Sequence, residues 1–187
     1  MRIFITGGCK TGKSTLAQIL ALKKRPACRP LYYLASMIPS DDEDKARIAR
    51  HRCEREGLGF ETIEVHRNIL TALDKCEKSG FILFDSVTAL LANEMFEAAG
   101  VIQPDAYKKI IYELDKLLAE TNNIVIVSDY IHSDAFIFGS PTELYRFGLA
   151  CIHKHLAKIC DAVIESCYGN FIIHKGRSDL ILNHEYF

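Results

Sequence analysis

The sequence predicts an α/β protein, a three-layer sandwich in which a mostly parallel central sheet has helices on both faces. Short apolar, β-branched runs alternate along the chain with longer segments whose apolar residues have helical spacing. The runs are apolar throughout, as is typical of parallel strands buried on both faces. The first run also leads through a glycine-rich turn into a helical segment, which begins a strand-loop-helix unit.

Seven segments are expected to be strands. The last two are separated by the turn Tyr168-Gly169-Asn170 and can pair antiparallel, whereas strands joined by helices are expected to be parallel. The expected strands are residues 2–6, 31–35, 60–65, 81–84, 124–128, 162–165 and 171–174.

Six segments are expected to be helices, and their ends are marked by breakers and caps. Pro26 follows the first, and Pro104 separates the fourth from the fifth. Ser40 and Glu43 have the spacing of a capping box at the start of the second, which Gly57 ends. The expected helices are residues 13–24, 41–56, 66–78, 87–99, 105–120 and 142–160, with a loop at 136–141.

Length and charge limit the classes of function. A chain of 187 residues suits one domain, residues 1–187, with a substantial core. The formal net charge is -1, so no overall field attracts the protein to nucleic acid or to membranes. No apolar run approaches the ~20 residues that span a bilayer. We therefore expect neither nucleic acid nor membrane as a partner, and any anion site must be local.

The cysteines indicate a reducing compartment. There are seven, an odd number, and no C-x-x-C pair occurs. The segment MRIFITGG lacks the apolar core and cleavage site of a signal peptide. A cytoplasmic protein with free thiols is the expectation. Most of the cysteines are expected to be small buried hydrophobes, but Cys9 lies in the phosphate loop described next and is a candidate for oxidation.

The strongest signal is Gly7-Gly8-Cys9-Lys10-Thr11-Gly12-Lys13-Ser14, which fits the phosphate-loop pattern G-x-x-x-x-G-K-[ST]. Glycines let backbone N–H groups surround phosphate oxygens, and the following helix N-terminus adds free donors. Lys13 would contact the terminal phosphates, and the Ser14 hydroxyl would bind Mg²⁺. The alternative is a glycine-rich turn with a surface lysine. The pattern predicts a P-loop NTPase-like, RecA-like fold that binds ATP or GTP; it does not distinguish the two bases.

A second ligand for Mg²⁺ should be an acidic residue at the end of an apolar strand. Asp85 follows the strand at residues 81–84 and is the favoured residue. Its alternative role is to cap the helix that begins next. Asp129, at the end of the strand at 124–128, is the weaker rival.

The charged helix at 41–56 carries a candidate nucleophile. Arg47, His51 and Arg55 have i, i+4, i+8 spacing and share one face. Two cations beside an imidazole can handle phosphate, and they favour the neutral, nucleophilic ring. The alternative is a solvated face with pairs such as Glu43–Arg47.

These residues resemble the bifunctional adenosylcobinamide kinase / adenosylcobinamide-phosphate guanylyltransferases of cobalamin assembly. The resemblance covers nearly the whole chain and weakens after residue 100. It rests on these blocks, in order: the phosphate loop with its doubled glycine, Gly7-Gly8; Tyr33-Leu34-Ala35-Ser36; Asp42-Glu43; Arg47-Ile48-Ala49-Arg50-His51 with Arg55; Phe60, where the family tends to have Trp, followed by Thr62 and Glu64; and Asp85-Ser86-Val87-Thr88 with Asn93, where the family has Asp-Cys-Leu-Thr and a later Asn.

The resemblance implies two reactions. Adenosylcobinamide is phosphorylated by a nucleoside triphosphate, and His51 then takes GMP from GTP and passes it to the new phosphate. It implies that Lys13 and Mg²⁺ on Ser14 and Asp85 stabilise phosphate charge. The nucleotide would also be held by Ala35, Ser36, Met37, Arg52, Cys53, Glu54, Arg55 and Glu64. A homo-oligomer, with a trimer as one form, is implied as well, and it would help so short a chain to hold a corrinoid.

Two segments depart from the family's pattern. The family has Asn-Glu-Val-Gly where this chain has Asp129-Tyr130-Ile131-His132, followed by residues 133–136 in place of a glycine-rich segment. A Gly-Arg-Leu-Asn-Gln run corresponds to Ala150-Cys151-Ile152-His153-Lys154. These departures keep two alternatives open: a small-molecule kinase in which His51 is structural, and a nucleotide-binding regulator that does not act on a corrinoid.

Overall fold

A seven-stranded sheet forms the centre of the computed structural model, which describes residues 1–97, 100–132 and 135–177. Its strand order is β3-β2-β4-β5-β1-β6-β7. The neighbours are parallel except β6 and β7, which are antiparallel. The seven predicted strands and this antiparallel pair are thereby confirmed. The strands are β1 (Arg2–Gly7), β2 (Leu31–Ala35), β3 (Phe60–Glu64), β4 (Phe81–Asp85), β5 (Ile124–Asp129), β6 (Ala162–Cys167) and β7 (Asn170–Lys175).

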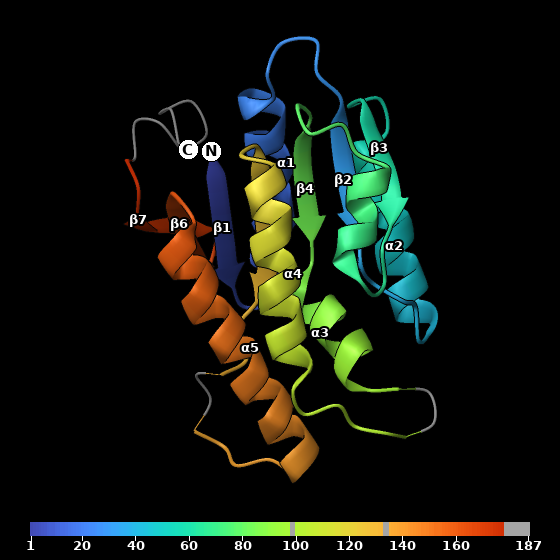
Figure 1. Cartoon of the computed structure of the whole chain (residues 1–187), viewed down its shortest axis with the longest axis vertical. Helices are drawn as coiled ribbons and strands as arrows, with labels where there is room; N and C mark the ends of the chain where they lie inside the picture. The colour runs from blue at the N-terminus through green and yellow to red at the C-terminus, as the bar shows by residue number, and fades with distance from the viewer. Residues whose placement is uncertain (98–99, 133–134, 178–187) are drawn as a thin grey trace.

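Helices cover both faces of the sheet, as predicted (Figure 1). One face carries α1 (Lys13–Lys24). The other carries α3 (Val87–Met95), α4 (Ala106–Glu120), α5 (Ser140–Ile159) and the short 3-10 helix η1 (Ile69–Asp74). The remaining helix, α2 (Asp42–Arg55), lies beside the β3 end of the sheet (Figure 1). It buries only Arg55, so it contributes little to the core.

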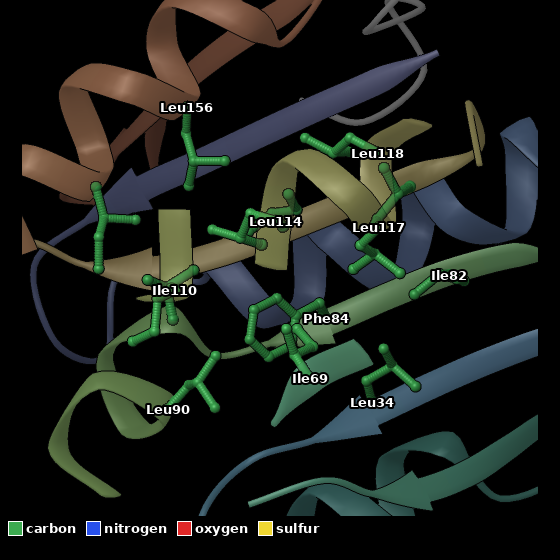
Figure 2. Packing of buried hydrophobic residues seen from close by; sticks show 14 of the residues in the cluster. Leu34, Ile69, Ile82, Phe84, Leu90, Ile110, Leu114, Leu117, Leu118 and Leu156 are labelled. Carbon is green, nitrogen blue, oxygen red and sulfur yellow. The ribbon is translucent and has the colours of Figure 1, made fainter. Parts of the chain in front are cut away.

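The core is divided between the faces by the two-residue period of the strands. Phe4 packs with the larger cluster under α3, α4 and α5, whereas Ile3 and Ile5 on either side of it pack with α1. Figure 2 shows the larger cluster, in which Phe84 lies among aliphatic side chains from several elements. Strands buried on both faces are fixed in register, and this holds their carboxyl ends at one edge.

The prediction of a helix over residues 66–78 is wrong, because only Ile69–Asp74 is helical and it forms a 3-10 turn. Asn68 before it has a left-handed backbone with φ of 50°. The carboxylates of Glu94 and Glu113 accept hydrogen bonds from the backbone N–H groups of Asn68 and Ile69, at 2.8 and 3.1 Å. Tertiary contacts therefore satisfy the backbone donors at the start of this short helix and set where it begins.

Three helix ends also differ from the prediction. The cap of α2 is Asp41, which accepts from the Asp44 N–H at 2.8 Å, one residue later than the predicted box at Ser40 and Glu43. Helix α3 ends at Met95 because the chain turns into a bridge between Phe96 and Ile102; residues 98–99 lie outside the described part. Helix α5 begins at Ser140, two residues before the predicted start. Pro141 lies in its first turn, where proline is tolerated because its missing N–H has no partner there in any case.

Within the described residues, no helix is long and apolar enough to cross a lipid bilayer.

Candidate active site

The phosphate loop lies between the end of β1 and the start of α1, at the carboxyl edge of the sheet. Gly7 is required there by close packing, because a Cβ atom at this position would lie 2.3 Å from the carbonyl oxygen of Ser166 on β6. Gly12 precedes α1 with φ of 89°, which favours glycine. The Ser166 hydroxyl donates to the Thr11 carbonyl at 2.5 Å. The neighbouring strand therefore shapes the loop, which is where open α/β sheets bind ligands.

Lys13 is 5% exposed and lies at the first position of α1. Its ammonium group donates to the Gly8 carbonyl and forms an ion pair of 2.7 Å with Asp129 Oδ1. Asp129 is thus the counter-ion of the lysine. Its side chain is 20% exposed and lines the cavity described below.

Ser14 and Asp85 lie in contact, with the serine hydroxyl donating to Asp85 Oδ2 at 2.8 Å. The capping role considered for Asp85 belongs to Ser86, whose hydroxyl accepts from the Ala89 N–H at 3.3 Å. A hydroxyl and a carboxylate are hard oxygen ligands, and Mg²⁺ is usually held by one or two such groups together with substrate phosphates and water. The pair fits Mg²⁺, whereas no cluster of three or more His, Cys, Asp or Glu side chains suited to a metal occurs in the described chain.

Tyr33 was not predicted as a site residue. Its hydroxyl donates to the same Asp85 oxygen at 3.0 Å, and its ring lies 3.4 Å beneath the guanidinium carbon of Arg55. Burial, followed by the charge of Asp85, raises the pKa of Tyr33, so the phenol stays protonated and donates. Because β2 is buried on both faces, no periodicity singled this residue out.

A cavity of about 830 Å³ opens beside these groups, a size typical of small-molecule sites. Asp85 and Asp129 lie on its sheet side. The helix side is formed by α2, where the predicted shared face is present: Arg47, His51 and Arg55 all line the cavity. The structure therefore places the candidate nucleophile and the candidate metal carboxylate around one space.

His51 makes one contact that orients its ring. Its Nδ1 lies 3.0 Å from Glu54 Oε2, one turn along α2. A carboxylate can only accept, so Nδ1 carries the proton in the neutral ring and Nε2 keeps its lone pair. The imidazole side chain is 22% exposed. This tautomer leaves Nε2 as the nucleophilic atom.

Arg55 is the buried cation of the site, at 7% exposure. Its Nε and Nη1 atoms are buried without a hydrogen-bond partner in the described structure. A buried guanidinium without acceptors is costly unless an anion satisfies it. Arg52, by contrast, is exposed and pairs with Glu64 at 2.7 Å.

The remaining predicted nucleotide residues line the cavity, line a neighbouring hollow, or lie on the phosphate loop. Ala35 and Met37 line the cavity, as do Arg52 and Glu64. Cys53 lines a neighbouring, more open hollow, and Cys9 is exposed on the phosphate loop. The exposed Lys10 of that loop lies 3.7 Å from Glu43 of α2.

Ser36 has a supporting position. It is fully buried, its hydroxyl donates to the Ser86 carbonyl at 2.7 Å, and the same oxygen accepts from the Ser86 N–H at 2.8 Å. Its own carbonyl accepts from Asn93 at 2.8 Å. The side chain thus joins the ends of β2 and β4 and does not reach the cavity. Sequence reasoning assigned it to the nucleotide because a motif does not show which way each member points.

Solved structures share this fold at low sequence identity. A KaiC-like protein from Pyrococcus horikoshii is 16% identical with a TM-score of 0.54, over 94% of this chain and 79% of that one. A prototypical ATPase from the type III secretion system of pathogenic bacteria is 15% identical with a TM-score of 0.50, over 88% of this chain and 50% of that one. These similarities show the RecA-like P-loop NTPase fold.

A relative and a family identify the chain more closely. The bifunctional adenosylcobalamin biosynthesis protein CobP of Pseudomonas aeruginosa is 26% identical over 174 residues, which is 90% of this chain and 94% of that protein. The family described as cobinamide kinase / cobinamide phosphate guanyltransferase matches residues 3–172. With a match of that extent, over the phosphate loop, the α2 helix and the cavity between them, this chain belongs to the cobinamide kinase / cobinamide phosphate guanyltransferase family.

Proposed function

We propose that this chain, as one transferase domain, catalyses both reactions of its family. It phosphorylates a hydroxyl of adenosylcobinamide with ATP or GTP, and it transfers GMP from GTP to the resulting phosphate through a guanylylated His51. The observation that carries this is the shared cavity, which has Asp85 on one side and His51 on the other. Covalent nucleotide transfer requires a nucleophile and phosphate-stabilising groups within reach of one substrate.

In the proposed kinase step, Lys13 leaves Asp129 for the terminal phosphates, and the backbone of the phosphate loop holds the others. Mg²⁺ held by Ser14 and Asp85 would neutralise charge on the phosphate oxygens. Tyr33 keeps the carboxylate of Asp85 oriented by donating to Oδ2. Arg47 and Arg55, on the opposite wall, are placed to receive phosphate charge.

In the proposed guanylyl step, His51 Nε2 attacks the α-phosphorus of GTP and pyrophosphate leaves. Glu54 accepts from Nδ1–H at 3.0 Å, which stabilises the cationic ring of the phosphoramidate. The acceptor phosphate then attacks the same phosphorus and regenerates His51. Both transfers gain from cations beside the reacting phosphate.

The test is incubation with Mg²⁺ and GTP labelled at the α-phosphate or at the γ-phosphate, followed by detection of label on the denatured chain. We expect acid-labile α-label that disappears in His51→Ala. His155→Ala is the matched control, because His155 on α5 also pairs with a carboxylate, Asp115, at 2.6 Å. An unlabelled wild type that still consumes GTP would instead indicate a simple kinase.

We also propose a cytoplasmic homo-oligomer, with a trimer as the form that the resemblance implies. Its support is an exposed apolar group around the start of α5, formed by Phe136, Ile137, Phe138, Leu144 and Phe147. An exposed apolar surface of this kind is typical of a protein interface. Sedimentation should give a multiple of 21.1 kDa. A fully active monomer would contradict the proposal.

A further inference from the structure

The two segments that depart from the family's sequence pattern meet in the structure. His132 follows β5 and His153 lies on α5, and His132 Nε2 is 3.1 Å from His153 Nδ1. Their ring centroids are 5.1 Å apart with an interplanar angle of 79°. The two departures therefore form one feature of the structure, a pair of imidazole rings in contact.

His153 is a buried histidine for which the family's two reactions give no role. It is 7% exposed, with the ring of Phe4 on one side at 5.1 Å. Its Nε2 lies 2.8 Å from the hydroxyl oxygen of Ser128, at the carboxyl end of β5. Burial, and to a lesser degree the neighbouring His132, lowers the pKa of His153 to about 3. The ring is therefore neutral, with one nitrogen donating and the other accepting.

From Ser128 the contacts continue to the cavity wall. The Ser128 and Thr88 hydroxyl oxygens are 3.0 Å apart, and Thr88 lines the cavity. Thr88 is held in place by the Asp129 N–H, which donates to its hydroxyl oxygen at 2.8 Å. Tyr145 donates to its carbonyl at 2.8 Å. A continuous line of hydrogen bonds thus runs from the cavity through the core to the exposed His132.

This line can carry its protons in either direction. Each of its three contacts joins a hydroxyl or a neutral imidazole to another such group, so either partner can donate. When Thr88 donates to Ser128, every proton points toward His132, and when His132 donates to His153, every proton points toward the cavity. The two arrangements differ by the passage of one proton along the line.

We propose that Thr88, Ser128, His153 and His132 form a proton relay that removes the proton of the acceptor hydroxyl during the kinase step. The inference rests on the proposed function, because it needs a hydroxyl acceptor in the cavity. Such a proton must leave as the oxygen bonds to phosphorus, and its transfer to a positioned group accelerates the reaction.

The acceptor oxygen bonds to the γ-phosphorus while the bond to the leaving nucleoside diphosphate breaks with its electron pair. The acceptor proton passes to the Thr88 oxygen, and the Thr88 proton passes to Ser128. The Ser128 proton passes to His153 Nε2, and the Nδ1 proton of His153 passes to His132 Nε2.

The exposed end returns the proton to solvent. His132 becomes an imidazolium and then releases a proton, which restores a neutral ring. Partial burial of the ring, then the charge of Arg146, lowers the pKa of His132 and so favours that release. The groups facing the pair are Ser128 on β5, Arg146 on α5 and the adjacent Tyr130.

The guanylyl step provides an internal control. His51 attacks GTP through a nitrogen lone pair, and no acceptor hydroxyl loses a proton when the enzyme is guanylylated. A change that breaks the relay should therefore slow cobinamide phosphorylation and leave guanylylation unchanged, whereas a change that damages the fold slows both.

The experiment compares His153→Gln and His132→Gly with the wild type. Glutamine can keep a hydrogen bond to Ser128, but its amide does not pass a proton onward. His155→Gln, two residues further along α5, is the control. Two rates are measured with each protein: single-turnover phosphorylation of cobinamide with MgATP, in H₂O and in D₂O mixtures, and labelling of the chain by α-labelled GTP.

We expect His153→Gln to lower the phosphorylation rate about 10²-fold, within the range of general acid–base catalysis, with guanylylation unchanged. For the wild type, the phosphorylation rate should depend on the D₂O fraction along a curve, because several protons move together. The variants should show a smaller isotope effect. If His153→Gln fails to fold, His132→Gly tests the same relay and should also lower the phosphorylation rate.

Two results would overturn the relay alone. One is phosphorylation by both histidine variants at the wild-type rate and isotope effect, which would leave Asp129 as the base. The other is an equal loss of both rates, which would make the histidines structural. A wild type that guanylylates but phosphorylates no cobinamide would overturn the proposed kinase function itself, and the relay with it.

Discussion

The sheet side of the cavity is built from buried strand ends, whereas its helix side is one polar helix with a single buried residue. Lys13, Ser14 and Asp85 are fixed by β1, β4 and α1, and strands buried on both faces hold them. Helix α2 is attached through Arg55 on Tyr33 and through exposed pairs such as Arg52–Glu64. Exposed pairs contribute little, about 0–1 kcal/mol each.

The two halves of the site are therefore stabilised by different forces. The core fixes the strand ends and the helix that carry the phosphate-binding groups. The position of His51 depends on polar contacts, and the unpartnered atoms of Arg55 indicate that a bound anion would strengthen them.

The largest effect should come from the sheet side. Lys13→Ala removes the charge nearest the transferring phosphates, and loss of one such group lowers kcat about 10²–10³-fold. Both cobinamide phosphorylation and guanylylation should fall, as measured by single-turnover assays. Lys108→Ala removes an exposed lysine paired with Asp105 and should leave both rates unchanged. If Lys13→Ala retains either activity, that reaction does not depend on the lysine of the phosphate loop.

The free energy of unfolding should depend on the core that supports the sheet more than on α2. Leu114→Ala removes a fully buried side chain of α4 and should lower the free energy of unfolding by about 2–5 kcal/mol. Ile48→Ala on α2, where the side chain is only partly buried, should cost less than about 1 kcal/mol. Urea unfolding followed by circular dichroism measures both. Similar costs would show that α2 is part of the core.

The pH dependence of stability should follow His153. Its pKa is about 3 in the folded protein, below the ordinary value of 6.5, so the unfolded chain binds the proton first as pH falls. Stability is therefore full above pH 6.5 and is lost toward pH 3, with about 2 kcal/mol lost by pH 5. Urea unfolding at pH 7 and pH 5 measures it. His153→Gln should lose less unfolding free energy between pH 7 and pH 5. If its loss equals that of the wild type, a group other than His153 causes the pH dependence.

The smallest effect should be confined to α2. Asp41→Ala removes its N-cap and should cost about 1 kcal/mol, so hydrogen exchange of the α2 amides should become roughly fivefold faster. The midpoint of global unfolding should hardly change. Asp42→Ala removes the same charge one residue later without removing the cap. If Asp41→Ala instead lowers global stability, α2 unfolds together with the sheet.

Local sequence signals predicted the parts of the site that lie close together in the chain. The phosphate loop followed from its glycines and lysine, and the common face of Arg47, His51 and Arg55 followed from helical spacing. The choice of Asp85 over Asp129 as the carboxylate beside Ser14 agrees with the 2.8 Å contact. Asp129 lies on Lys13 instead, a pairing that no local pattern could indicate.

Contacts between distant segments could not be predicted, because propensity and periodicity describe only near neighbours in sequence. The carboxylates of Glu94 and Glu113, on α3 and α4, bind the backbone at the start of η1, a helix that is shorter than the pattern predicted. Tyr33 reaches Asp85 across two adjacent strands, and Ser36 faces Ser86 and not the cavity.

The α/β class, the seven strands and the phosphate loop followed from the sequence alone, because each depends on residue type and spacing over a few residues. The polar groups that meet are known only from the folded chain: Lys13 with Asp129, Tyr33 with Asp85, and His132 with His153. The physical reason is that the order of strands in the sheet brings their carboxyl ends to one edge, and strand order is set by packing of the whole chain.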